Sequence, residues 1–300
     1  SGCDVITLTD ASTTVLVTNG GADSITSANS TITVVSSTAV TVVGASGNDV
    51  VTLSGSGDLY VSASSGNDNI VATGSGTHTF AFSDSNLSSS DTVTGGTGAD
   101  TISVSGCGTI VMSGVTGVET LSLIASTAGN QTITLASSVT QLSGDASCQS
   151  VEFASTVANV TVNLGAGNDT VRLASGTNSL TVSNVETVFG SAGADTVTAQ
   201  TATVIDSGGG GNDRFTGSSG NDTFTFSGDF TGTDLVNGAG GVDTLIVGTA
   251  GNINLGGVSN VEILSLTATG SYSVSLTDGI TTVSGSTGND AITLTNVVSG

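Results

Sequence analysis

Two nine-residue segments in direct tandem carry the residues with the clearest chemistry in this sequence. Residues 208–216 read Gly-Gly-Gly-Gly-Asn-Asp-Arg-Phe-Thr and residues 217–225 read Gly-Ser-Ser-Gly-Asn-Asp-Thr-Phe-Thr, which places Asp213 and Asp222 nine residues apart. The glycines allow a tight turn with positive φ, and the phenylalanine after each aspartate predicts a short strand with its apolar side chain turned inward. An aspartate in such a turn lies beside backbone carbonyl groups, and oxygen ligands of this kind suit Ca²⁺. The tandem segments therefore predict calcium sites at Asp213 and Asp222.

The same Gly-x-Asp turn occurs twelve times in the 300 residues. The second residue after the aspartate is apolar in all twelve copies, although only 36% of the chain is apolar, so chance does not explain the pattern. The twelve aspartates are Asp4, Asp23, Asp49, Asp68, Asp100, Asp169, Asp195, Asp213, Asp222, Asp234, Asp243 and Asp290. Turn formation without metal is the simpler reading of an isolated copy, because Asp and Asn favour tight turns. A column of carboxylates about 5 Å apart repels itself unless cations intervene, and we therefore predict that these aspartates bind Ca²⁺.

The spacing of the aspartates gives the length of the repeating unit. The residue numbers of Asp49 and Asp68 differ by 19, and a half-period of nine also occurs. The half-period adds Asp58 and Asp91 to the predicted calcium ligands, because they lie nine positions from Asp49 and Asp100. Each unit thus has two strands and two turns. Units stacked in parallel are expected to align the aspartates in columns along the outside.

Short strand-like segments recur about ten residues apart, from Val5–Leu8 to Ala291–Leu294. They are rich in β-branched residues and are bounded by Gly, Ser, Asn and Asp, whereas no segment has helical periodicity with caps. Pro is absent, which suits a structure that uses its backbone N–H groups in ladders. The sequence predicts an all-β fold, a parallel β-roll or right-handed β-helix with about 18–19 residues per coil and about 15 coils.

A second motif, Val-Glu-x-apolar, keeps the register of the repeat at Glu119, Glu186 and Glu262. We read these glutamates as solvated surface positions rather than ligands. The stretch from about 119 to 160 has no Gly-x-Asp turn and is expected to be irregular. We predict one continuous solenoid over residues 1–300.

Composition excludes several classes of function. The chain has 24 acidic residues, two arginines and no lysine, for a net charge of −22. Such a charge argues against nucleic acid and anionic membrane surfaces as partners, and implies strong self-repulsion unless cations bind. No stretch approaches 18 apolar residues, so no membrane insertion is expected.

An enzyme is not expected either. The only histidine, His78, lies in a Thr-His-Thr-Phe strand pattern and is read as an outward side chain. One His, two Tyr, two Arg and no Lys leave little for acid–base chemistry at neutral pH. Asp10, Asp84, Asp145, Asp206, Asp229 and Asp278 lack the Gly-x-Asp signature and are read as turns. The three cysteines, Cys3, Cys107 and Cys148, do not form a disulfide scaffold; a bridge between Cys107 and Cys148 would need an enlarged coil.

The tandem segments resemble the Gly-Gly-x-Gly-x-Asp-x-U-x nonapeptide, with U apolar, of repeats-in-toxin (RTX) proteins. The resemblance covers about two thirds of the chain. It implies a parallel β-roll with multiple Ca²⁺ ions held between successive turns. The Val-Glu segments are similar to segments beside RTX repeats in secreted bacterial surface-layer proteins.

The resemblance implies a secreted, calcium-stabilised structural protein that forms a surface layer, sheath or extracellular filament by self-assembly. It implies an extracellular, cell-surface location reached by type I secretion. The alternative is a stalk or ligand-binding segment of a large RTX adhesin. A cell-surface polysaccharide is a further expected partner. Gly2-Cys3-Asp4 and Ser299-Gly300 read as parts of a repeat, so we expect end-to-end association or flanking sequence.

Overall fold

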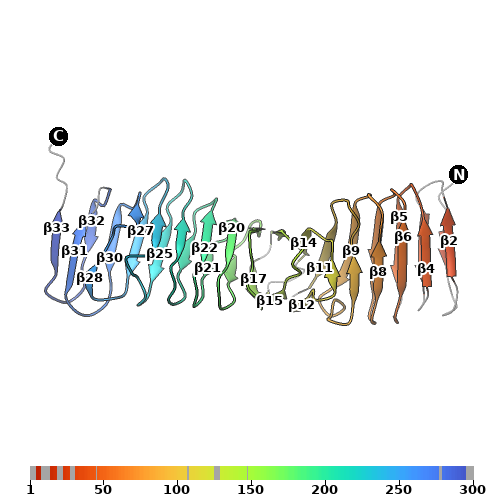
Figure 1. The fold of residues 1–300 in the computed structure, drawn as a ribbon, viewed down its shortest axis with the longest axis horizontal. Coiled ribbons are helices and arrows are strands. Elements are labelled where there is room, and N and C mark those ends of the chain that lie inside the picture. The colour runs from red at the N-terminus through yellow and green to blue at the C-terminus, as the bar shows by residue number, and fades with distance from the viewer. Residues whose placement is uncertain are drawn as a thin grey trace. The chain divides into compact units, whose positions relative to one another are not determined.

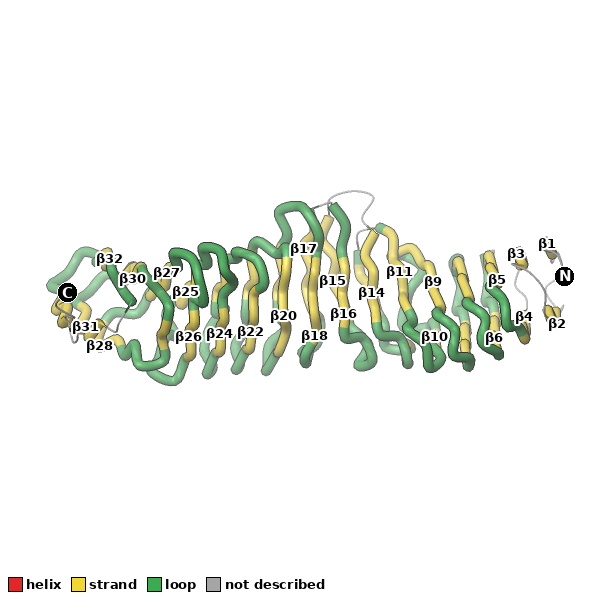
Figure 2. Tube along the Cα trace, turned by 90° about the horizontal axis from the view of Figure 1, so that it is seen from above, coloured by secondary structure: helices red, strands yellow, loops and turns green. Residues whose placement is uncertain are grey.

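The computed structural model describes residues 5–7, 14–18, 23–27, 31–44, 46–106, 108–124, 129–146, 148–276 and 279–294, with side chains left out at 14–18, 23, 27, 129–130 and 294. These residues form the coils of a parallel β-solenoid fold, about 14 in all and without helix. Figure 2 shows strands of successive coils stacked side by side within each half of the chain. The predicted fold class is thus confirmed. The chain forms two compact units, Ser1–Gln149 and Ser150–Gly300. The predicted single solenoid over the whole chain stays a prediction.

The first unit contains three sets of parallel strands, which Figure 1 draws in red to green. One sheet has the order β1 (Val5–Thr7), β3 (Asp23–Ser27), β5 (Val40–Gly44), β7 (Leu59–Ser62), β9 (His78–Ser83), β11 (Thr101–Ser105), β14 (Thr120–Ile124) and β16 (Gln141–Ser143). A second has the order β2 (Thr14–Thr18), β4 (Thr31–Val35), β6 (Val50–Ser54), β8 (Asn69–Ala72), β10 (Thr92–Thr94) and β13 (Val115–Thr116). The third pairs β12 (Thr109–Val111) with β15 (Gly129–Thr134).

The second unit repeats this arrangement. One set of neighbouring strands is β18 (Val160–Asn163), β20 (Ser179–Ser183), β22 (Thr196–Ala199), β24 (Arg214–Thr216), β26 (Leu235–Asn237) and β29 (Val258–Ser259). Another is β17 (Gln149–Phe153), β19 (Thr170–Arg172), β21 (Thr187–Phe189), β23 (Val204–Asp206), β25 (Thr223–Phe226), β27 (Thr244–Val247), β30 (Ile263–Leu266) and β32 (Thr282–Ser284). The last set is β28 (Gly251–Ile253), β31 (Tyr272–Leu276) and β33 (Ala291–Leu294).

Coil length varies around the predicted value. Leu59 pairs with His78, a difference in residue number of 19, but Asp23 pairs with Val40, a difference of 17, and Asn69 with Thr92, a difference of 23. The additional length of the longer coils lies in turns, because the strands keep their register from coil to coil. No helix in the described part of the chain could span a membrane.

Columns of apolar side chains form the core of each unit. In the second unit Val188, Ile205, Phe224, Leu245 and Leu264 align on successive strands, and all five are fully buried. Alternate residues along each strand point inward, as the two-residue period of a strand requires. Each such side chain stabilises the fold by roughly 1.5–3 kcal/mol when buried.

Candidate calcium centre

Twelve of the fourteen predicted aspartates lie directly before a strand, and most of these are buried. Ten are no more than 4% exposed: Asp49, Asp68, Asp91, Asp100, Asp169, Asp195, Asp213, Asp222, Asp234 and Asp243. The expectation that they line the outside of the solenoid is therefore wrong. The reason is the two-residue period: the apolar residue two positions later faces the core, so the aspartate faces the same side.

In the second unit the buried aspartates are joined in ladders. The N–H of Asp195 donates to Oδ1 of Asp213 at 2.9 Å, and the N–H of Asp213 donates to Oδ1 of Asp234 at 2.9 Å. On the neighbouring sheet the N–H of Asp222 donates to Oδ1 of Asp243 at 2.7 Å. Each carboxylate thus binds the start of the strand in the preceding coil.

The first unit contains the same kind of hydrogen-bonded column. The N–H groups of Asp49 and Asp68 donate to Oδ1 of Asp68 and Asp91 at 2.9 and 2.8 Å. In another column His78 takes the place of an aspartate. Its N–H donates to Oδ1 of Asp100 at 2.9 Å, and its Nδ1 lies 2.6 Å from the same oxygen. His78 is fully buried, so the prediction of an outward side chain is wrong.

The glutamates of the Val-Glu motif continue these ladders. The N–H of Asp100 donates to Oε2 of Glu119 at 2.9 Å, and the N–H of Asp243 donates to Oε2 of Glu262 at 2.8 Å. Asp169 and Glu186 are joined in the same way. These glutamates are half-buried, and their reading as solvated surface positions is corrected. The longer side chain lets them reach the same N–H from the same register position.

The second carboxylate oxygen, Oδ2, has two kinds of surroundings. Oδ2 of Asp195 and Oδ2 of Asp222 accept hydrogen bonds from the N–H and the hydroxyl of a serine four residues earlier, Ser191 and Ser218. In contrast, Oδ2 of Asp68, Asp100 and Asp243 is buried without a hydrogen-bond partner in the protein. A buried carboxylate oxygen without a donor is costly, and a cation would remove that cost.

At two glycines, the absence of a side chain lets an Oδ2 atom of these aspartates lie close to a backbone carbonyl oxygen. A Cβ at Gly238 would lie 2.3 Å from Oδ2 of Asp243 and 1.8 Å from the carbonyl oxygen of Asn260. A Cβ at Gly95 would lie 2.6 Å from Oδ2 of Asp100 and 1.9 Å from the carbonyl oxygen of Gly117. A carboxylate oxygen and a carbonyl oxygen of the next coil therefore converge beside each glycine.

The donor set fits a hard cation. It consists of carboxylate and carbonyl oxygens, which Ca²⁺ prefers. Among the described residues, no group of three or more His, Cys, Asp or Glu side chains is placed to hold a metal ion. Each site therefore offers few carboxylates, and backbone carbonyls and water would have to supply the remaining ligands. The carboxylates would neutralise the ion's charge, and the ion would bridge successive coils.

Burial also changes the acidity of the ladder. It raises the pKa of Asp213 to about 7 and that of Asp68 to about 6. The N–H of the preceding aspartate opposes this effect, and the neighbouring carboxylates in the column add to it. Burial raises the pKa of Asp243 as well. The columns thus hold negative charge at a cost that bound cations would offset.

Four of the predicted calcium ligands are not among the buried aspartates of the columns. Asp4 lies outside the described residues, and the side chain of Asp23 is not described. Asp58 is exposed, because it lies one residue before the register position of the column, and its Oδ1 accepts from the N–H of Thr77. Asp290 is half-buried, and its Oδ1 accepts from the N–H of Tyr272 at 3.1 Å. Which aspartates bind Ca²⁺ stays a prediction.

Two members of the ladders, His78 and Asn178, do not belong to a Gly-x-Asp turn, so that pattern did not predict them. The side chain of Asn178 accepts from the N–H of Val157 at 3.0 Å and donates to Oδ1 of Asp195 at 2.8 Å. Both residues follow a glycine by two positions, Gly76 and Gly176, and both precede an apolar residue by two. A search for Gly-x-polar-x-apolar would have found them.

Of the cysteines, only Cys148 lies within the described residues, where it is exposed. Cys3 and Cys107 lie outside them, so a Cys107–Cys148 bridge stays open.

The comparison with protein families agrees with the ladder geometry. The model of the RTX calcium-binding nonapeptide repeat (4 copies) matches residues 87–106, 157–180 and 207–229. These segments contain Asp91, Asp100, Asp169, Asp213 and Asp222, all of which are buried ladder members. No curated protein and no solved structure matches the chain. The chain therefore carries RTX calcium-binding nonapeptide repeats in these three segments, and such repeats imply Ca²⁺ binding at multiple sites.

Proposed function

We propose that this chain is a secreted building block that self-assembles into a surface layer, sheath or filament once Ca²⁺ binds. RTX repeats on a β-solenoid are typical of calcium-binding extracellular structural proteins, which usually leave the cell by type I secretion. The family is structural or toxin-associated rather than catalytic. The observation that carries the proposal is the run of buried carboxylates from coil to coil in a chain of net charge −22.

The charge explains why calcium would control the fold. Extracellular Ca²⁺ sites bind at about 10⁻⁴–10⁻³ M, so these columns would fill only where Ca²⁺ is abundant. A ligand that binds the folded state alone stabilises it by mass action, and several sites add their contributions. The chain would therefore fold after export and stay poorly folded before it.

An uncharged groove of about 360 Å³ on the first unit supports contact with a second copy. It lies on the outer face of the sheet with β7, β9, β11 and β14, between Tyr60 and Ile124, which are 44% and 50% exposed. None of the residues that line it carries a charge. Two copies of so acidic a chain repel each other over most of their surface, and an uncharged patch is where they can approach.

Electron microscopy of the full chain, with millimolar Ca²⁺ and with a chelator, tests the proposal. Ordered sheets or uniform filaments in Ca²⁺ alone are expected. A folded chain that stays monomeric in Ca²⁺ would contradict self-assembly and favour the alternative, a stalk or binding segment of a large RTX adhesin. A cell-surface polysaccharide is the partner we propose in either case, because a surface protein needs an attachment to the cell.

A further inference from the structure

A second groove, of about 570 Å³, lies in the second unit where β19, β21 and β23 end, beside the loops that follow β21, β23 and β25. Its volume falls within the roughly 300–1,000 Å³ of small-molecule sites. Arg172, Phe189 and Asp206 align on three successive strands at its floor. Ser227 and Asp229 line the other side. The parallel register, with strands about 4.8 Å apart, thus brings a cation, an aromatic ring and two carboxylates together.

Arg172 is one of two arginines in the chain, which has no lysine. Its guanidinium carbon lies 4.4 Å from the centroid of the Phe189 ring, a cation–π contact. Among the described residues, the one contact at salt-bridge distance joins His78 and Asp100; none involves Arg172, although Glu152 pairs with it in the strand register. Stacking fixes the guanidinium plane and leaves its N–H edges for a ligand, and these edges match a carboxylate.

The two carboxylates are held in place by the loops around them. Oδ1 of Asp206 accepts from the N–H of Gly208 at 3.0 Å. Oδ2 of Asp229 accepts from the hydroxyl of Ser207 at 2.7 Å and from the N–H of Gly210 at 2.8 Å. The space above the loops is open, since a Cβ at Gly209 or at Gly228 would meet nothing within 4 Å. A bulky, flat ligand can therefore reach the floor of the groove.

We propose that this groove binds a sugar residue that carries a carboxylate, as in an acidic polysaccharide. Arg172 donates to the sugar carboxylate, while Asp206 and Asp229 accept from sugar hydroxyls. A phosphate group carries up to two negative charges, which Arg172 alone cannot neutralise beside Asp206 and Asp229, whereas a sugar carboxylate carries one. A single acidic side chain of a second copy would leave most of the volume unfilled and would offer no donors to the aspartates. The inference rests on the proposed polysaccharide partner and gives it a site.

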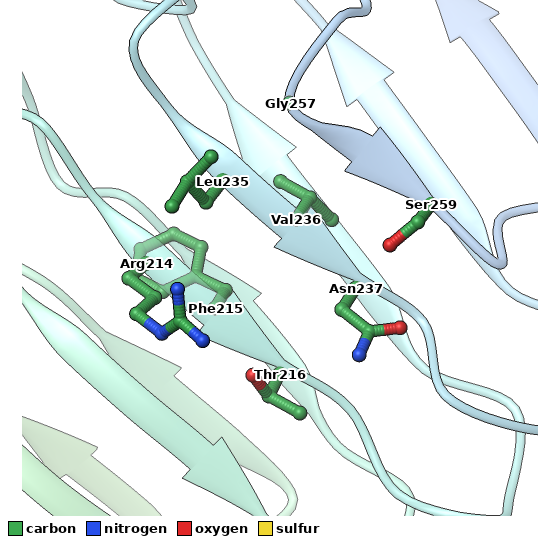
Figure 3. Close-up of a pocket in the computed structure, with 8 residues that line it drawn as sticks. All are labelled: Arg214, Phe215, Thr216, Leu235, Val236, Asn237, Gly257 and Ser259. Carbon is green, nitrogen blue, oxygen red and sulfur yellow. The ribbon is translucent and has the colours of Figure 1, made fainter. Parts of the chain in front are cut away.

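The other arginine provides a matched control. Arg214 lines a hollow of about 200 Å³ on β24, β26 and β29, whose eight lining residues Figure 3 labels. Leu235 on its wall is 42% exposed. The side chains around the hollow are uncharged apart from Arg214, and Phe215 faces the core at 1% exposure. This hollow is smaller than the usual ligand site and contains no carboxylate. Arg214→Ala thus removes the same charge from an exposed strand position outside the groove.

The test is calorimetry of the full chain in millimolar Ca²⁺ with a trimer of galacturonic acid and, separately, the neutral trimer of galactose. We expect the acidic trimer to bind at least about tenfold more tightly than the neutral one, because a charge-assisted hydrogen bond discriminates by about that factor. Arg172→Ala should weaken binding of the acidic trimer by about 10- to 100-fold. Arg214→Ala should change the affinity for the acidic trimer by no more than about twofold, because no carboxylate accompanies Arg214 in its hollow.

Three results with the two arginine variants and the acidic trimer would overturn the inference, and a fourth comes from Phe189. One is no binding of the acidic trimer up to millimolar concentration, and another is equal weakening by Arg172→Ala and Arg214→Ala, which would indicate a general charge effect. The third is an Arg172→Ala variant that keeps saccharide affinity but loses calcium-induced assembly, which would assign the groove to a second copy. Phe189→Leu keeps an apolar side chain without the stacked ring, and an unchanged affinity there would also count against the site. Light scattering of the same samples reports assembly separately, so a failure of the groove is distinguishable from a failure of the proposed function.

Discussion

The backbone N–H of Asp213 donates a 2.9 Å hydrogen bond to Oδ1 of Asp234, in the next coil of the second unit. Asp213 in turn accepts the N–H of Asp195 at the same distance. Both carboxylates are buried, at 2% and 1% exposure. The column thus links coils through hydrogen bonds while it stacks like charges. The balance between these two effects governs how the protein responds to pH and to calcium.

Without calcium, the fold should become more stable as the pH falls from 7 toward 4. The pKa of Asp213 is raised to about 7 and that of Asp68 to about 6, whereas the unfolded chain titrates near 3.8. The native state therefore holds more protons than the unfolded state between about pH 4 and 7. Asp213 then lowers the free energy of unfolding by up to about 1.4 kcal/mol per pH unit as the pH rises from about 4 to 7, and Asp68 does so from about 4 to 6. Thermal melts in EDTA at pH 5 and pH 7.5 check this, and a higher melting temperature at pH 7.5 would contradict it.

Calcium should reverse that pH dependence. Bound Ca²⁺ favours the ionised carboxylates, so the calcium-loaded protein should be most stable near neutral pH and lose stability as protons displace the ion. Circular dichroism should show loss of the β signal when EGTA is added at pH 7.5. An identical spectrum and melting temperature with and without EGTA would rule out calcium-dependent folding. Mg²⁺ at the same concentration is the control, because it demands a stricter octahedral geometry.

Asp213→Ala should cost more stability than Asp58→Ala. Asp213 is buried and accepts the N–H of Asp195, so its removal leaves a buried donor unsatisfied, at about 1–3 kcal/mol. Asp58 is exposed, and the N–H of Thr77 that it accepts can turn to water. Urea titration gives the free energies of unfolding, and calorimetric Ca²⁺ titration gives the stoichiometry. Equal losses of bound Ca²⁺ in the two variants would show that burial does not select the binding aspartates.

Much of this fold was predictable from the sequence, because the coil repeats one simple pattern. Asp213 predicts the turn, and the apolar Phe215 two positions later predicts which face of β24 points inward. The burial of the aspartates follows from the same alternation, although the stacking of the coils alone was expected to place them in columns along the outside. The hydrogen-bond partner of each carboxylate could not be predicted from the sequence. It depends on the length of each coil, which differs between the Asp23–Val40 and Asn69–Thr92 pairings. Coil length also decides whether an aspartate such as Asp58 reaches the register position of the column.

Glycine at position 238 should be essential to one carboxylate site. Gly238→Ala would push its methyl group to 1.8 Å from the carbonyl of Asn260 and 2.3 Å from Oδ2 of Asp243. Backbone cannot move away cheaply within a hydrogen-bonded ladder, so we expect a loss of about 1–3 kcal/mol and weaker Ca²⁺ binding. Gly228→Ala is the matched control, because its methyl group meets nothing within 4 Å. Equal melting temperatures for the two variants would mean that the site tolerates the added carbon.

Charge placed in the uncharged groove of the first unit should block assembly without unfolding the protein. Tyr60 and Ile124 are 44% and 50% exposed on the outer face, so Tyr60→Glu and Ile124→Glu add charge without burying it. Since every copy already carries a net charge of −22, a further carboxylate at a contact adds repulsion where two copies would have to approach. Light scattering in millimolar Ca²⁺ should show the loss of large assemblies, while circular dichroism shows an unchanged calcium-dependent β signal.

Thr79→Glu is a third variant on the same outer face, at the position that pairs with Tyr60, and it should act in the same way. Val204→Glu, at a 39% exposed position of β23 in the second unit, is the control. If the Val204 variant blocks assembly as strongly as the Tyr60 variant, added charge anywhere is enough and the groove is not a specific contact.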